Sequence, residues 1–393
     1  MMLGVWMWPQ SVRVHGAKKA VAWCARCGVT DIYFLVKGLG GGVAYASEIA
    51  PAVSHRDLLQ ELLEAAHARQ IRVHAWFTSA SDEHYKTLHP ESGRCHFLRG
   101  KDAGLISLAD EGYIAYMEQI IREVCSRYDI DGLHLDYIRY NHLIYGWSDE
   151  DLARYAAEGA DVAYLQDTMH RMFAAEDKEP ELLFDAYRAG DPSAHALART
   201  RRKDVKTFAS RLVHTALETK PSLILSAALM PEGAYDDLAF ADLHYGQNYE
   251  DAAGLYDYAL PMAYSLAYDK DAQWVRQVAE GTLKHGLKTV VGLHAYDCGT
   301  QATLQADIAA LADTPVEGVC LFREGAFVMA FAGPESLTVY NAMDVTITRL
   351  MVDDQAHDVS LASGDDITLP CPGASTVQAF NGDKELCVYL VRE

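Results

Sequence analysis

The sequence predicts an α/β protein, a (β/α)8 TIM barrel followed by a small C-terminal antiparallel β-domain. Short apolar runs alternate with helical segments through most of the chain, which is typical of a parallel sheet with crossover helices. Eight such runs occur before the pattern changes, and eight is the strand number of a closed barrel. The length of 393 residues suits a barrel of about 250–330 residues with an appendage.

The eight runs and their helices can be placed in order. Strands are expected at 3–8, 31–36, 71–77, 132–136, 223–228, 256–262, 289–294 and 318–322. Helices are expected at 16–27, 56–69, 111–128 and 201–219, with further helices between the last three strands. Ser54 is the expected N-cap of the second helix. The glycine-rich segment 38–42 lacks the spacing of a phosphate loop and is interpreted as a loop at the barrel rim.

Residues 1–333 are assigned to the barrel and 334–393 to a small β-sandwich-like domain. In the second part, short alternating runs are separated by Gly and Asp turns, a pattern typical of antiparallel strands. Residues 141–199 form an insertion after the fourth strand that is rich in Tyr, Trp, Asp and Glu. A connection of this length usually forms a lid or a cleft wall.

The composition restricts the partners. A formal charge of −21 disfavours nucleic acid and anionic membranes as partners, whereas a neutral sugar is compatible with it.

The sequence contains no run of 18 apolar residues, so we expect no transmembrane helix. The chain begins without a signal-peptide pattern, so we expect a cytoplasmic protein, or an exported one whose signal peptide is absent from this chain. The eight cysteines are scattered, and the Cys24/Cys27 pair has no second pair at zinc-site spacing. The oligomeric state is not predicted.

The active site of this fold lies at the C-terminal ends of the strands. Aromatic residues mixed with charged and polar groups at such a rim suit a sugar, which has apolar ring faces and many hydroxyls. The expected substrate-binding residues at these ends are Trp8, Lys37, His74, Trp76, His134, Arg139, Tyr264, His294 and Asp297. For the tryptophans, the alternative is that they fill the barrel core.

Asp136 is the strongest single candidate. His134 and Asp136 share one face of the fourth strand, so both are expected to point into the barrel mouth. The alternative is a structural salt bridge between Asp136 and Arg139 or another arginine. Glycoside cleavage usually needs a second carboxyl group. Glu232 is the first choice because it follows the neighbouring strand, with Glu324 and Asp297 next; each of these could instead be a solvated loop residue.

A metal site is the rival interpretation. His74, His134, His294 and Asp136 could converge on zinc or manganese in the barrel mouth. Neither an H-x-H nor an H-E-x-x-H spacing supports this, and histidines also bind sugar hydroxyls. We therefore expect neither a metal ion nor a cofactor.

Several motifs carry a family resemblance. Residues 131–140 read DGLHLDYIRY and residues 73–77 read VHAWF. Supporting pieces are GVW at 4–6, AYAS at 44–47 and D-x-x-x-P-M-x-Y at 257–264. Over residues 3–330 the chain resembles the glycosyl-hydrolase-like TIM-barrel family called family 10-like, or uncharacterised lipoprotein glycosidases. The resemblance implies a barrel acting on glycans, with Asp136, His74 and Tyr264 lining the site.

The chain departs from related patterns at two positions. Lys37 stands where relatives often carry Arg. Ile138 occupies the position of the acid glutamate in the chitinase motif D-x-x-D-x-D-x-E, so chitinase chemistry is not expected.

The function expected from the sequence is hydrolysis of an oligo- or polysaccharide. Asp136 would be the nucleophile or charge-stabilising carboxylate, and Glu232 or Glu324 the acid/base. His74, His134, Tyr264 and His294 would bind hydroxyls. The alternatives are a non-catalytic glycan-binding barrel and a metal-dependent hydrolase.

Overall fold

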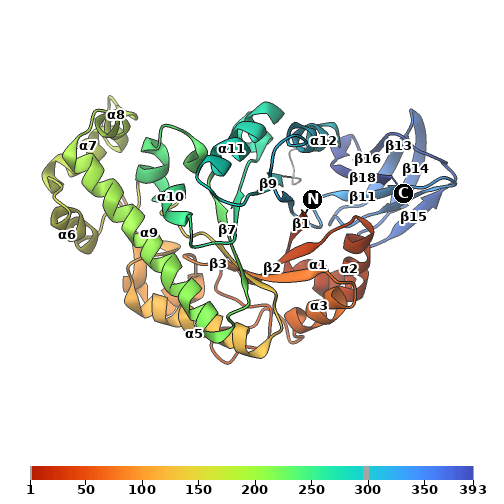
Figure 1. Cartoon of the computed structure of the whole chain (residues 1–393), viewed down its shortest axis with the longest axis horizontal. Coiled ribbons are helices and arrows are strands. Elements are labelled where there is room, and N and C mark those ends of the chain that lie inside the picture. The colour runs from red at the N-terminus through yellow and green to blue at the C-terminus, as the bar shows by residue number, and fades with distance from the viewer. Residues whose placement is uncertain (1, 295–300, 393) are drawn as a thin grey trace.

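The computed structural model of the chain describes residues 2–294 and 301–392. A barrel occupies the middle of the molecule (Figure 1). Helices α6, α7 and α8 lie at one end, and the C-terminal strands lie at the other.

The barrel consists of eight parallel strands in the order β8-β7-β6-β3-β2-β1-β10-β9. Isolated bridges between Ala259 and Thr289 and between Met262 and Gly292 join the two ends of this order, which closes the barrel. The strands are β1 Met2–Met7, β2 Asp31–Lys37, β3 Arg72–Thr78, β6 Gly132–Asp136, β7 Ile224–Leu229, β8 Tyr258–Pro261, β9 Val290–His294 and β10 Gly318–Phe322. The predicted (β/α)8 barrel is confirmed.

Helices cover the outside of the barrel. They are α1 Pro9–His15, α2 Ala17–Arg26, α3 Leu58–His67, α5 Glu111–Arg127, α9 Pro192–Thr219, α11 Ala272–Lys284 and α12 Gln301–Ala310. The predicted N-cap Ser54 is wrong: helix α3 begins after Asp57, whose carboxylate accepts the backbone N–H of Gln60 at 3.0 Å. Helix α9 starts at Pro192, well before the predicted residue 201, because Asp191 caps it and proline is favoured in the first turn.

The segment between β3 and α5 contains several short elements. These are helix α4 Glu83–Leu88, the 3₁₀ turn η1 Pro90–Ser92 and the hairpin β4 Gly93–His96 with β5 Gly100–Ile106. Runs this short carry little periodic signal.

The insertion forms its own helical cluster beside the barrel. Its helices are α6 Asp149–Ala157, α7 Val162–Phe173 and α8 Leu182–Arg188. The buried guanidinium of Arg201 in α9 donates to the carbonyls of Leu143 and Leu243, which ties the start of the insertion to the π-helix η3 Ala241–Tyr245.

The C-terminal region forms two four-stranded sheets with a shared apolar core, in the orders β15-β12-β11-β18 and β14-β13-β16-β17. The strands are β11 Val328–Ala332, β12 Leu337–Tyr340, β13 Ile347–Val352, β14 Gln355–Leu361, β15 Asp366–Leu369, β16 Val377–Asn381, β17 Lys384–Leu386 and β18 Val388–Arg392. Most neighbours are antiparallel, but β11 pairs with β18 in parallel.

Aromatic contacts hold this region against the barrel. Trp23 of α2 stacks on Tyr340 with ring centroids 4.6 Å apart, and the guanidinium of Arg26 lies 4.1 Å from the ring centroid of Phe331.

None of the helices in the described part of the chain is long and apolar enough to cross a membrane.

Candidate active site

A pocket of about 530 Å³ opens at the carboxyl ends of the barrel strands. It is lined by Trp6, Trp8, Leu35, Leu39, Trp76, Thr78, Asp136, Tyr137, Arg139, Ala228, Met230, Met262, Tyr264, Tyr268 and Phe322. Five residues predicted from the sequence therefore lie here: Trp8, Trp76, Asp136, Arg139 and Tyr264. Among the described lining residues, Asp136 is the only carboxylate, and seven of the fifteen are aromatic.

Three N–H donors hold the carboxylate of Asp136 at the end of β6. The backbone N–H of Tyr137 and the guanidinium of Arg139 approach Oδ1 at 2.6 and 3.2 Å, and the indole N–H of Trp76 donates to Oδ2 at 3.2 Å. Tyr137 has a φ of 56°, a left-handed conformation that is uncommon for residues other than glycine. Asp136 therefore forms the salt bridge with Arg139 that was the alternative to a catalytic role, and it also lines the pocket. The two interpretations do not exclude each other.

Glu232 lies beside this pocket, in the 3₁₀ turn η2 Pro231–Ala234 that directly follows β7. Its side chain is buried and interacts with the hydroxyls of Tyr245 and Tyr268, of which Tyr268 lines the pocket. Burial raises the pKa of Glu232, while these hydroxyls and the charge of Arg139 counteract part of the rise. The charge of Arg139 therefore acts on both Asp136 and Glu232.

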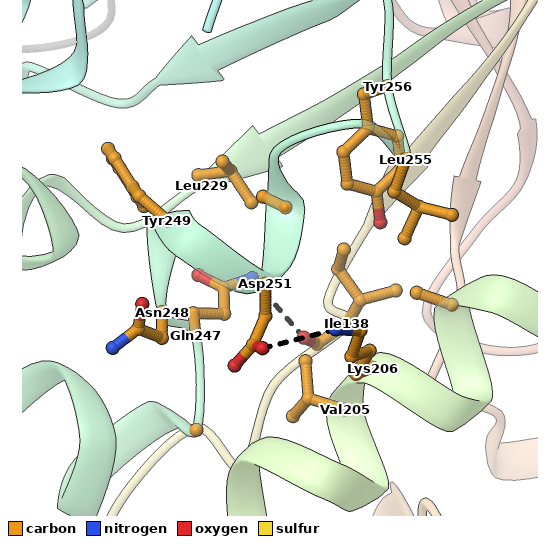
Figure 2. Close-up of a pocket in the computed structure, with 13 residues that line it drawn as sticks. Ile138, Val205, Lys206, Leu229, Gln247, Asn248, Tyr249, Asp251, Leu255 and Tyr256 are labelled. Atoms are coloured by element: carbon orange, nitrogen blue, oxygen red, sulfur yellow. Dashed lines mark hydrogen bonds and ion pairs between the residues drawn. The ribbon is translucent and has the colours of Figure 1, made fainter. Parts of the chain in front are cut away.

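The side-chain amide of Gln247 joins the segments that carry these two carboxyl groups. Its Oε1 accepts the backbone N–H of Met230 at 2.9 Å, and its Nε2 donates to the carbonyl of Ile138 at 3.2 Å. Gln247 lies at a small cavity between α9 and the short helix α10 Tyr249–Ala252, where Lys206 and Asp251 form an ion pair at the edge (Figure 2). This cavity, of about 20 Å³, has room for about one water molecule.

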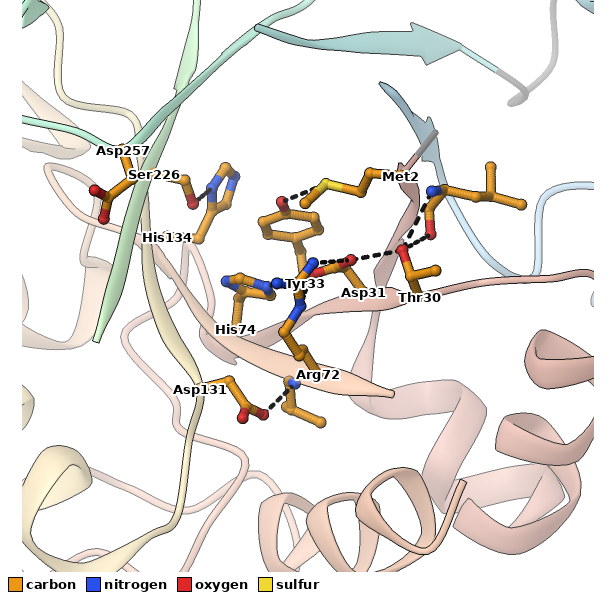
Figure 3. A network of polar contacts seen from close by, with 12 residues as sticks. Met2, Thr30, Asp31, Tyr33, Arg72, His74, Asp131, His134, Ser226 and Asp257 are labelled. Atoms are coloured by element: carbon orange, nitrogen blue, oxygen red, sulfur yellow. Dashed lines mark hydrogen bonds and ion pairs between the residues drawn. The ribbon is translucent and has the colours of Figure 1, made fainter. Parts of the chain in front are cut away.

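The substrate contacts of His74 and His134 stay predictions: both rings are fully buried and neither lines the pocket. Figure 3 shows the polar partners of both rings. Nε2 of His74 bonds to Asp31 at 2.8 Å, and its ring stacks on Tyr33. His134 contacts Trp6 through Nε2 and Ser226 through Nδ1.

His74 also packs against the start of the fourth barrel strand. A Cβ at Gly132 would lie 2.2 Å from Nδ1 of His74, so only glycine fits opposite this ring. His74 is therefore part of the packed barrel interior.

Lys37 and Glu324 do not line the pocket either, so their predicted roles stay predictions. The ammonium of Lys37 is buried in an ion pair with Asp82 at 3.0 Å and donates to the carbonyl of Ser81 at 2.9 Å. Glu324 is fully buried and accepts a hydrogen bond from the hydroxyl of Ser11 in α1. Burial raises the pKa of Glu324 to about 7.

His294 lies next to the pocket, where it stacks on Tyr264 with ring centroids 4.7 Å apart. Asp297 lies outside the described residues. Within the part of the chain that is described, no group of three or more His, Cys, Asp or Glu side chains is placed to hold a metal ion.

The sequence predictions did not include several wall residues: Trp6, Leu35, Leu39, Thr78, Tyr137, Ala228, Met230, Met262, Tyr268 and Phe322. A signal existed for some of them. Met262 and Phe322 are the last residues of predicted strands, and Met230 follows the predicted strand 223–228 by two residues. Tyr268 follows Tyr264 by four residues in a strand-to-helix loop.

Comparisons with known proteins agree with this architecture. The glycoside hydrolase domain of PgaB (BpsB) from Bordetella bronchiseptica superposes with a TM-score of 0.63 at 13% identity, over 82% of this chain and 94% of that domain. The catalytic domain of β-amylase from Paenibacillus polymyxa gives 0.59 at 11% identity, over 82% and 92%. β-Galactosidase from Marinomonas ef1 gives 0.59 at 14% identity, over 82% of this chain and 54% of that enzyme.

At these identities the likeness shows the fold. No curated protein matches the sequence. The resemblance noted in the sequence is nevertheless confirmed, because residues 112–305, which include the segment of Asp136 and Glu232, match the family described as Glycosyl hydrolase-like 10.

Proposed function

We propose that this protein is a glycoside hydrolase that cleaves an oligo- or polysaccharide in the pocket around Asp136. The observation that carries the proposal is the position of Asp136: a carboxylate held by three N–H donors on the wall of a pocket lined mainly by aromatic and aliphatic side chains. A carboxylate is costly to bury without a role, and its donors fix it in one orientation.

Asp136 is the nucleophile or the carboxylate that stabilises positive charge on the sugar. Its geometry is set by backbone and indole N–H groups, which cannot lose their protons at physiological pH. An acceptor-only side chain facing the pocket suits an oxocarbenium-like transition state.

Glu232 is the acid that protonates the leaving oxygen. Burial raises its pKa, so it retains its proton to higher pH than an exposed glutamate would. Arg139 bonds to Asp136, and its positive charge also offsets part of the rise in the pKa of Glu232.

The aromatic walls provide sugar binding. Trp8, Trp76 and Tyr264 present ring surfaces to the pocket, and pyranose rings have apolar faces that pack on such surfaces.

A hydrolysis screen tests the proposal. The purified chain is incubated with cello-, malto-, chito-, xylo- and galacto-oligosaccharides and with their aryl glycosides, and the release of reducing ends or of the aryl alcohol is measured. We expect turnover on at least one series, lost in Glu232→Gln on the natural oligosaccharide. Binding without turnover on any series would instead indicate a non-catalytic glycan-binding barrel. Loss of activity with a chelator would indicate a metal-dependent hydrolase.

A further inference from the structure

We propose that a second cavity beside the Asp136 pocket is a binding subsite for further sugar residues of the same substrate. This cavity of about 340 Å³ lies between α1 and the loop that follows β2. Its lining residues include Trp8, Gln10, Arg13, Leu35 and Gly38. The inference rests on the proposed function and narrows it: the substrate is an oligosaccharide long enough to span both cavities.

The two cavities adjoin each other. Trp8 and Leu35 line both of them, so a chain bound at Asp136 can extend past Trp8 into the second cavity. Each volume lies in the range of ligand sites, about 300–1,000 Å³.

Trp8 is held rigidly at the boundary. The guanidinium of Arg323 lies 3.8 Å from the centroid of its ring, and the ring of Phe322 meets it edge-on at 6.4 Å. The side chain remains partly exposed. A fixed, partly exposed indole can bind a sugar face with little loss of side-chain entropy.

Polar groups for hydroxyls come from one face of α1. Gln10 and Arg13 are three residues apart, so they are neighbours on the helix, and Nε of Arg13 donates to Oε1 of Gln10 at 3.1 Å. A guanidinium has five N–H donors, and the described contacts of this side chain use only those directed at Gln10. The remaining donors can bind sugar hydroxyls.

The lining contains no carboxylate among the described residues, and Arg13 is its only charged side chain. Hydrolysis needs carboxyl groups, so this cavity can bind a sugar but lacks the groups to cleave it. That composition distinguishes a subsite from a second catalytic centre.

The opposite wall is formed by a compact turn. The N–H of Gly38 donates to the carbonyl of Gly42 at 3.0 Å, and the N–H of Gly41 donates to the carbonyl of Gly38 at 3.0 Å. Gly38 and Gly42 line the cavity without side chains, which lets a ligand approach the backbone closely.

Calorimetric titration tests the subsite. Asp136→Asn protein, which holds substrate without cleaving it, is titrated with the disaccharide and the pentasaccharide of the same five oligosaccharide series. The comparison is made with and without Gln10→Ala/Arg13→Ala. Arg69→Ala is the matched control, because this exposed arginine lines a separate groove between α2 and α3.

We expect the pentasaccharide to bind more tightly than the disaccharide. The double variant should weaken pentasaccharide binding by about tenfold, which corresponds to the loss of two hydrogen-bonding side chains. Disaccharide affinity and the Arg69→Ala control should stay unchanged. If the pentasaccharide binds equally well to the double variant and to its parent, the subsite proposal is wrong. If the disaccharide still binds in that case, the proposed function is unaffected. Absence of binding by every sugar overturns both.

Discussion

The indole N–H of Trp6 donates a hydrogen bond to Nε2 of His134 across 3.0 Å, joining the first and fourth barrel strands beneath the pocket. Because the indole nitrogen can only donate, Nε2 is the acceptor and the ring proton lies on Nδ1, which faces the hydroxyl of Ser226 at 2.9 Å. Burial holds the pKa of His134 well below its usual value, so the ring is neutral. His134 thus positions Trp6, a residue of the pocket wall.

His134→Leu should therefore lower the free energy of unfolding by about 1–3 kcal/mol, because it leaves the buried indole N–H of Trp6 without an acceptor. KM should rise as well, since the ring of Trp6 is no longer fixed. His134→Gln, whose Oε1 can take the place of Nε2, should recover most of both losses. Urea denaturation and steady-state kinetics measure them. Equal defects in the two variants would show that the acceptor is unimportant.

Gln247→Met should reduce kcat by about 10–100-fold with a smaller change in KM. The variant keeps the side-chain size but removes both hydrogen bonds that join the segments of Asp136 and Glu232, and small displacements of catalytic groups are costly. Lys206→Ala, which changes only an exposed ion pair at the same cavity, is the control and should retain activity. A kcat equal in Gln247→Met and wild type would exclude this coupling.

The pH profile should have a basic limb set by Glu232. Its pKa is raised by burial, so the protonated acid is present at low pH and is lost as the pH rises through that raised value. Tyr268→Phe removes a hydroxyl that favours the ionised form, so the limb should move to higher pH. The dependence of kcat/KM on pH measures this shift. A limb that stays in place, or moves to lower pH, would assign the ionisation to another group.

Glu324 should make stability depend on pH. Its pKa is about 7 in the folded protein against 4.5 for an ordinary glutamate. Below pH 4.5 both states are protonated and nothing is lost. Between about pH 4.5 and 7 the unfolded state ionises while the folded state keeps its proton, so the free energy of unfolding falls by about 3 kcal/mol in total and levels off above pH 7. Glu324→Gln should lack this decrease. Urea denaturation at several pH values compares the two proteins, and parallel curves would contradict the assignment.

The sequence predicted the barrel well because strand and helix periodicities repeat eight times. The fourth strand was placed at its observed bounds, Gly132–Asp136, and Asp136 lies where it was expected. Alternation along that strand also put His134 on the inner face, as observed. The alternation does not tell how far a side chain lies from the mouth of the barrel. His134 precedes Asp136 by two residues, about 6–7 Å along the strand, and lies below Trp6.

Lys37 shows a second limit. Leu35 lines the pocket, and regular alternation would place Lys37 there too. An irregularity between Leu35 and Lys37 shifts the pairing with β3, and Lys37 turns to Asp82 instead. Glu324 lies beyond the last barrel strand, where the loop conformation, not periodicity, directs it to Ser11. Bulges and loops of this kind leave no periodic trace in one sequence.

The kcat of Asp136→Asn on the best substrate of the hydrolysis screen tests directly whether the carboxylate of Asp136 takes part in glycoside cleavage. Asparagine keeps the size of the side chain and removes its charge. We expect turnover to fall by at least about 10³-fold, while substrate affinity and the urea midpoint stay close to those of wild type. Turnover near the wild-type rate would show that Asp136 takes no part in the reaction.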